Sequence, residues 1–141
     1  DYFASLEEIL RASTDRLAEI NIELLRFLLD AMGIQTPLLV ASTLDLPNEQ
    51  GGTNVNIGIC QRVGATVYLS GVSGRDYLNC ERFDAEGIQV QFQQFLHPIY
   101  EQAYDPFLPC MSAVDLLFNH GPESLSILRG IGVERLETCF E

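Results

Sequence analysis

Residues 64–78 constrain the fold of this chain more than any other stretch of its sequence. Residues 65–69 are apolar, aromatic or β-branched throughout, which is typical of a short strand that is covered on both faces. Small residues then interrupt this run, and Gly71 and Gly74 among them can adopt positive φ angles that other residues resist. Residues 75–86 next favour a helix that ends at Gly87. A strand, a tight turn and a helix are together typical of a compact α/β domain.

Two other segments supply the remaining strands of the predicted sheet. Residues 37–41 are continuously apolar, and residues 88–92 alternate apolar side chains with glutamines. We therefore expect strands at residues 37–41, 66–69 and 88–92, with the last at or near a sheet edge because one of its faces is polar. Residues 53–63 fit a strand or a helix. Thr53 as N-cap and Gly64 beyond the end favour a helix, which is also the crossover that parallel strands need.

The other predicted helices cover residues 2–11, 15–32, 112–119 and 122–128. The helix at residues 15–32 should start at a cap from Ser13 or Thr14, end at Gly33 and pack across one face of the sheet, because it is apolar outside one charged stripe. The tail after Gly130 shows no clear pattern. The expected fold is a single α/β domain over residues 1–141, with a small, mainly parallel three-stranded sheet, flanking helices and short C-terminal helices.

The charge of the chain excludes some partners. The net charge is −12 at pH 7, and all eight basic residues are arginines. A nucleic acid polymer and an anionic membrane surface are therefore poor partners. No apolar run is long enough to cross a bilayer. The chain begins at Asp1 with a very apolar first third, so we expect a piece of a longer protein whose exposed apolar surface packs against the missing part or in a homo-oligomer.

The four cysteines give no metal signature. Cys60, Cys80, Cys110 and Cys139 are widely spaced, and none forms a Cys-x-x-Cys pair. A zinc site would need ligands from four separate places, and a domain of this size does not need a disulfide framework. We expect reduced thiols in a cytoplasmic protein, with no metal and no cofactor.

Several segments in one order carry a family resemblance: YLSGVSGRDYL at residues 68–78, VQFQQF at 90–95, HPIYEQ at 97–102 and SAVDLLFNHG at 112–121. With them the chain resembles the WbqC-like protein family, from about the first helix to Leu128, which corresponds to the C-terminal two-thirds of the family pattern. The resemblance implies a bacterial protein encoded among genes for O-antigen and other surface polysaccharides. It implies a cytoplasmic role in making or modifying an activated sugar, and an N-terminal portion rich in aromatic and acidic residues that this chain lacks.

The turn after the central strand is the first candidate site. Backbone amides there could hold a phosphate at a helix N-terminus, with Arg75 as a cationic fork. A tight turn with a capping serine explains the same residues equally well. The predicted substrate-binding residues of this turn are Ser70, Gly71, Ser73, Gly74, Arg75 and Tyr77.

The aromatic loop at residues 95–109 is the second candidate, since long irregular loops are often functional. His97 and Asp115 are the catalytic candidates for acid or base chemistry, and His120 is a weaker one. Tyr100 and Gln102 could bind a sugar by stacking and hydrogen bonding. The alternatives are a solvated histidine, aromatic loop packing and, for Asp115, a capping role beside Ser112.

Three function classes stay open. The first is an enzyme of surface-polysaccharide assembly that transfers a group on a nucleotide-linked sugar, so that the partner is a phosphate-bearing small molecule. The second is a non-catalytic binding or scaffold domain of such a pathway. The third is a piece that works only together with the missing N-terminal portion.

Overall fold

The computed structural model describes residues 2–12, 14–46, 51–130 and 135–139, and the chain divides into two compact units. One unit, here the helical unit, comprises residues 1–38 and 97–132, and the other, the sheet unit, comprises residues 39–96 and 133–141. Each unit is therefore built from two separate segments of the sequence.

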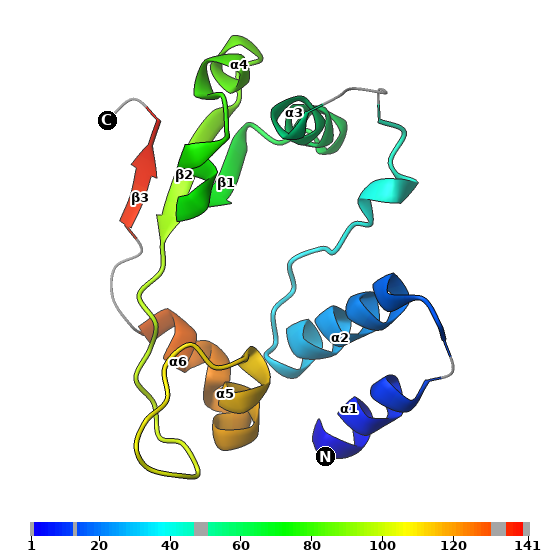
Figure 1. Cartoon of the computed structure of the whole chain (residues 1–141), viewed down its shortest axis with the longest axis vertical. Coiled ribbons are helices and arrows are strands. Elements are labelled where there is room, and N and C mark those ends of the chain that lie inside the picture. The colour runs from blue at the N-terminus through cyan, green and yellow to red at the C-terminus, as the bar shows by residue number, and fades with distance from the viewer. Residues whose placement is uncertain (1, 13, 47–50, 131–134, 140–141) are drawn as a thin grey trace. The chain divides into compact units, whose positions relative to one another are not determined.

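The sheet unit contains three strands in the order β1-β2-β3 (Figure 1). β1 (Val67–Gly71) pairs in parallel with β2 (Gln89–Gln94), and β2 pairs antiparallel with β3 (Arg135–Thr138). The α/β class is confirmed, but the prediction of a mainly parallel sheet is wrong, because only one of the two pairings is parallel. The third strand comes from the C-terminal tail, where the sequence shows no clear pattern.

The predicted strand at residues 37–41 is wrong. These residues are extended without strand pairing and lead into a 3₁₀ turn, η1 (Ala41–Thr43). Leu39 is 59% exposed, so the apolar run is not a buried strand. The run crosses the boundary between the two units, and no strand among the described residues pairs with it.

The core of the sheet unit lies on one face of the sheet. α3 (Gly52–Val63) and α4 (Cys80–Ala85) contribute to it, and its buried residues are Ile57, Cys60, Leu78, Phe83, Ile88, Val90 and Phe92. On the other face Val67 and Leu69 are 43% and 54% exposed. The prediction that β1 is covered on both faces is therefore wrong. The prediction that β2 lies near an edge is also wrong, because β2 is the central strand. The polar face of β2 arises because its glutamines alternate with residues that face the core, and it does not mark an edge strand.

The helical interpretation of residues 53–63 is confirmed, and α3 ends as predicted at Gly64, whose φ is +69°. The predicted helix at residues 75–86 is interrupted. η2 (Val72–Asp76) is a 3₁₀ turn, and α4 starts only after Asn79, whose side chain accepts a hydrogen bond from the Arg82 amide at 3.0 Å. A new N-cap inside the predicted helix explains the break, since Asn competes for helical amides.

The helical unit contains α1 (Tyr2–Arg11), α2 (Leu17–Ala31), α5 (Ala113–His120), η3 (Gly121–Glu123) and α6 (Ser124–Gly130) (Figure 1). α2 ends as predicted before Gly33, with φ +69°, and the Ile34 amide donates to the Leu29 carbonyl at 2.8 Å. The predicted cap from Thr14 is wrong, because Arg16 is the N-cap of α2 and no described side chain caps the helix. Thr14 Oγ1 accepts from the Arg16 amide, before the helix begins, and Ser13 lies outside the described residues. α2 and the sheet belong to different units, so the packing of this helix across the sheet stays a prediction.

The expectation of four reduced thiols is wrong for one pair. Cys80 and Cys139 form a disulfide with their Cα atoms 6.1 Å apart, whereas Cys60 is a buried free thiol and Cys110 an exposed one. Sequence spacing did not indicate this pair, because it depends on β3 returning beside β2 and bringing Cys139 to the start of α4. Burial raises the pKa of the Cys60 thiol.

Candidate functional site

One carboxylate gathers the polar side chains of the aromatic loop. Asp115 Oδ2 accepts hydrogen bonds from Tyr100 Oη at 2.8 Å and from Gln102 Nε2 at 2.9 Å. Asn119 Nδ2 donates to Asp115 Oδ1 at 3.3 Å and to the Asp115 carbonyl at 2.8 Å. We call this group the Asp115 cluster; its members are His97, Tyr100, Gln102, Phe107, Asp115, Asn119 and His120.

Two elements position these groups. Asp115 and Asn119 are four residues apart on α5 and therefore lie on the same helix face. Ser112 caps this helix, since its Oγ accepts from the Val114 amide at 3.3 Å, as the sequence predicts. The carboxylate of Asp115, however, holds loop side chains, a role that the capping interpretation did not include.

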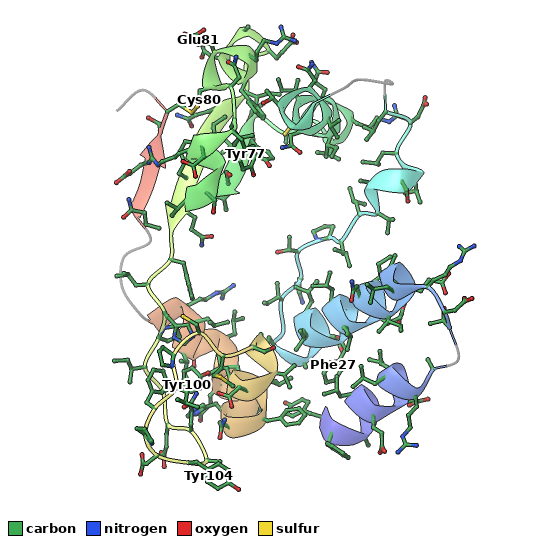
Figure 2. All side chains as sticks on the ribbon, viewed as in Figure 1. Phe27, Tyr77, Cys80, Glu81, Tyr100 and Tyr104 are labelled. Carbon is green, nitrogen blue, oxygen red and sulfur yellow. A yellow bond between two sulfur atoms is a disulfide. The ribbon has the colours of Figure 1, made fainter. Side chains whose placement is uncertain are left out.

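Gln102 closes the loop on itself. Its Oε1 accepts from the Leu108 amide at 2.8 Å, and its Nε2 donates to the Leu108 carbonyl at 3.0 Å. The same Nε2 also reaches Asp115. A single amide side chain therefore fixes both ends of residues 102–108 against α5. Tyr104, within this closed segment, is 86% exposed, whereas Tyr100 is 8% exposed (Figure 2).

Tyr100 lies among three rings. Its ring centroid is 6.1 Å from that of His97, 5.5 Å from that of Phe107 and 5.6 Å from that of His120. Burial raises the pKa of Tyr100, and the hydrogen bond to Asp115 raises that pKa further, against an opposing contribution from Gln102. Tyr100 therefore stays protonated near neutral pH, and its hydroxyl donates a hydrogen bond to the carboxylate.

Backbone carbonyls fix the tautomers of both histidines. His97 Nδ1 lies 2.7 Å from the Pro98 carbonyl, and His120 Nε2 lies 2.8 Å from the Glu101 carbonyl. A carbonyl only accepts hydrogen bonds, so each of these nitrogens carries the proton. In the neutral ring the lone pair then belongs to Nε2 of His97 and to Nδ1 of His120. The cluster therefore combines two imidazoles of defined basic nitrogen with one carboxylate.

The second candidate site, the glycine turn (residues 70–77), is held largely by structural contacts. Ser70 is 7% exposed, and its Oγ donates to the Gly71 carbonyl at 3.2 Å. A Cβ on the buried Gly74 would lie 2.1 Å from Ser70 Oγ. Gly74 therefore meets a steric requirement, since its φ is not positive and no side chain fits there. Ser73 and Tyr77 are exposed.

Arg75 is the cation of this turn, and it has partners already. Its Nη2 donates to Glu137 Oε2 of β3, and its guanidinium carbon lies 4.4 Å from the centroid of the Phe92 ring. An incoming anion would have to compete with the Glu137 carboxylate for this guanidinium.

The structure thus brings five predicted residues together in the helical unit, namely His97, Tyr100, Gln102, Asp115 and the weaker candidate His120. The predicted residues of the glycine turn belong to the sheet unit. Sequence reasoning missed Phe107, Asn119 and Glu137. The four-residue spacing from Asp115 was a signal for Asn119, whereas nothing in the tail pointed to Glu137.

Within the described ranges no group of three or more His, Cys, Asp or Glu side chains is arranged to hold a metal ion. None of the helices described is both long and apolar enough to cross a membrane.

Comparison with known proteins gives the family. A model of the WbqC-like protein family matches residues 1–127, and the chain therefore belongs to this family, as the resemblance indicated. The chain is 36% identical over 114 residues to an uncharacterized protein, Rv1507c, of Mycobacterium tuberculosis. The match covers 80% of this chain and 48% of that protein, so the chain spans about half the length of this relative. No solved structure matches.

Proposed function

We propose that this chain acts in bacterial surface-polysaccharide (O-antigen) biosynthesis in the cytoplasm, as part of an enzyme that transfers a group on a nucleotide-linked sugar. The Asp115 cluster is the observation that carries the proposal. It holds two imidazoles, a carboxylate and aromatic rings within one loop and one helix. Group transfer to a sugar hydroxyl or amine needs a base, and pyranose rings bind against aromatic faces.

His97 is the proposed base. Because Nδ1 donates to the Pro98 carbonyl, Nε2 is the nitrogen that accepts a proton from the attacking hydroxyl or amine. Asp115 positions Tyr100 and Gln102 rather than taking the proton itself, since its carboxylate already accepts their hydrogen bonds. Tyr100, Gln102 and Asp115 thus form the sugar-binding wall of the proposed site.

In the sheet unit, the glycine turn is proposed separately as a phosphate-binding segment. Arg75 supplies a planar fork that suits phosphate oxygens, and its stacking on Phe92 restricts where that fork lies. Tyr77 is exposed and able to stack on a base. The backbone contribution comes from Ser70, Gly71, Ser73 and Gly74.

Titration calorimetry tests the proposal with three ligand types, namely a panel of nucleotide-linked sugars, the matching nucleoside diphosphates and the free sugars. We expect the nucleotide-linked sugars to bind, the free sugars to report the Asp115 cluster, and the nucleoside diphosphates to report the glycine turn, each as a separate measurement. His97→Asn should keep the affinity for nucleotide-linked sugars within about three-fold, because a proton acceptor contributes to the transition state rather than to ground-state binding. Asp45→Asn, at an exposed residue outside both candidate sites, is the control and should leave every affinity unchanged. Absence of binding by every ligand would contradict the proposal.

A non-catalytic binding or scaffold domain is the second candidate. This candidate is favoured because both Asp115 and Arg75 already have partners within the chain. Asp115 accepts hydrogen bonds from side chains of its own unit, and Arg75 forms an ion pair with Glu137. Under this alternative the chain binds a nucleotide-linked sugar but consumes none, and His97→Asn changes no product. A longer protein or a second copy would then supply the chemistry and cover exposed apolar residues such as Leu17, which is 71% exposed.

A further inference from the structure

The Cys80–Cys139 disulfide joins two elements of the sheet unit at the margin of its core. Cys80 is the first residue of α4, and Cys139 directly follows β3. Both cysteines are half-buried against the core, and both line a cavity of about 260 Å³ (Cys80 is labelled in Figure 2). The cavity gives a small thiol reagent room to approach the bond from outside.

The strand that this bond retains is short. β3 has four residues, and among the described residues its one partner strand is β2, along the register from Gln91↔Thr138 to Gln94↔Arg135. The two cysteines are separated by 59 positions in sequence. A disulfide that closes a loop of this length lowers the conformational entropy that the chain gains when β3 detaches. The disulfide is therefore a principal restraint on β3.

β3 also carries the partner of Arg75. Glu137 pairs in register with Phe92, and Arg75 lies over the Phe92 ring. Glu137 lies in β3 and precedes Cys139, which directly follows the strand, by two positions. Gln94 Nε2 donates to Glu137 Oε1 at 2.8 Å and adds a second contact within the same strand pair. The position of the Glu137 carboxylate thus depends on β3 being in place.

We infer that Cys80–Cys139 is a reversible thiol–disulfide site, and that its reduction releases β3 and frees Arg75 from Glu137 to bind an anion. The reductant is a thiol, either a dithiol or two molecules of a monothiol. Its thiolate attacks one sulfur of the bond, and a second thiolate resolves the mixed disulfide. Two electrons and two protons leave the reductant, which becomes a disulfide, while Cys80 and Cys139 become thiols.

Arg75 stays in position when β3 leaves. Its stacking partner Phe92 belongs to β2, and β2 remains paired with β1 along five register positions. Reduction therefore removes the competing carboxylate without removing the support of the guanidinium. The anion-binding step of this inference rests on the proposed function, whereas the release of β3 does not.

The test compares the oxidised chain with the chain reduced by dithiothreitol without oxygen. Hydrogen exchange of the amides that join β2 to β3 measures whether β3 is detached. Titration with inorganic pyrophosphate measures the affinity of the anion site. Reduction should speed this exchange at least about ten-fold while the amides between β1 and β2 keep their protection. Pyrophosphate affinity should rise by about ten-fold, the change expected for one hydrogen bond between charged groups.

Three variants separate the steps. Cys80→Ser with Cys139→Ser should behave as the reduced chain under both conditions, and Cys110→Ser, which removes an exposed free thiol, should behave as the parent. Glu137→Gln should bind pyrophosphate tightly whether the disulfide is closed or open.

Each result decides one step. Unchanged exchange on reduction overturns the inference. Faster exchange with unchanged pyrophosphate affinity, while Glu137→Gln binds tightly, overturns the link to Arg75 and leaves the phosphate site of the proposed function intact. If no form binds pyrophosphate, Glu137→Gln included, the phosphate site fails, and faster exchange still supports a reversible site that holds β3.

Discussion

The Asp115 cluster and the glycine turn use polar side chains in opposite ways. The cluster brings together residues from a loop and a helix, and its central carboxylate accepts from Tyr100 and Gln102 across the gap in sequence. The turn is one continuous segment. Its Ser70 hydroxyl donates to the carbonyl of the next residue, Gly71, whereas Arg75 forms its ion pair with Glu137, which is distant in sequence. A clear local pattern therefore predicted where a turn forms but not its partners, while an irregular loop produced the denser polar network.

The largest expected effect comes from removing the centre of the cluster. Asp115→Ala leaves the donors of buried Tyr100 and of Gln102 without their acceptor, so we expect a loss of about 2–4 kcal/mol in the free energy of unfolding. Urea unfolding measures it, with exposed Asp45→Ala as the control. A loss no greater than that of the control would mean that the cluster does not hold the loop to α5.

Gly74→Ala tests the packing of the turn. The new Cβ would meet Ser70 Oγ at 2.1 Å and Leu78 Cδ1 at 3.0 Å, so we expect a destabilisation of about 1–3 kcal/mol. Adding Ser70→Ala should restore part of the loss, because it removes the closest atom. Gly52→Ala is the matched control, since nothing lies within 4 Å of its Cβ position. Equal stability of Gly74→Ala and Gly52→Ala would contradict the steric role.

Tyr100→Phe probes one hydrogen bond of the cluster and should cost about 1 kcal/mol at pH 7. It should also change how the free energy of unfolding depends on pH above neutrality. The pKa of folded Tyr100 lies above its usual value of 10.0, so the folded chain keeps a proton that the unfolded chain loses, and stability falls as the pH rises past that value. The variant should lose this part of the dependence.

Thermal unfolding between pH 8 and pH 11 measures that slope. Tyr68 contributes in the same direction, because burial raises its pKa too, so the slope should shrink rather than vanish. Tyr104→Phe, at a tyrosine that is 86% exposed, is the control and should keep the parent slope. A slope for Tyr100→Phe as steep as the parent's would show that Tyr100 keeps an ordinary pKa.

Arg75→Ala should change stability least, by less than about 1 kcal/mol, because its ion pair with Glu137 is partly exposed and screened. Its effect should instead fall on binding, with about ten-fold weaker affinity for pyrophosphate in the reduced chain. Arg82→Ala, an exposed arginine on α4, is the matched control. Unchanged affinity of Arg75→Ala would remove Arg75 from the proposed phosphate site.

Local signals in the sequence predicted most of the helices and the positions of β1 and β2. Gly33, Gly64 and Gly87 end helices at positive φ, as their placement indicates. The same signals failed where pairing over long distance decides the structure. An apolar run at residues 37–41 has no strand beside it, whereas residues 135–138 pair with β2 without any strong strand pattern. Which strands pair is decided by tertiary structure, and the hydrophobic periodicity of one segment does not predict it.

The candidate site was predictable residue by residue but not as a group. The residue types of the loop suggested His97, Tyr100, Gln102 and Asp115 separately, each with a structural alternative. Their convergence depends on Gln102 closing the loop onto Leu108, a contact that no spacing rule supplies. In the sheet unit, the pairing of Glu137 with Arg75 and the Cys80–Cys139 bond both follow from the same unpredicted return of the tail.

The interleaving of the two units has a consequence for synthesis on the ribosome. α1 and α2 belong to the helical unit, but α5 and α6 of the same unit are translated only after residues 39–96. At typical elongation rates α2 therefore waits on the order of ten seconds for its partner helices. During that interval the half-buried apolar side chains of α2, Phe27 and Leu28 among them, lack the contact that α2 makes with α5. Nascent chains of this protein should accordingly be strong clients of ribosome-associated chaperones until residue 130 has emerged.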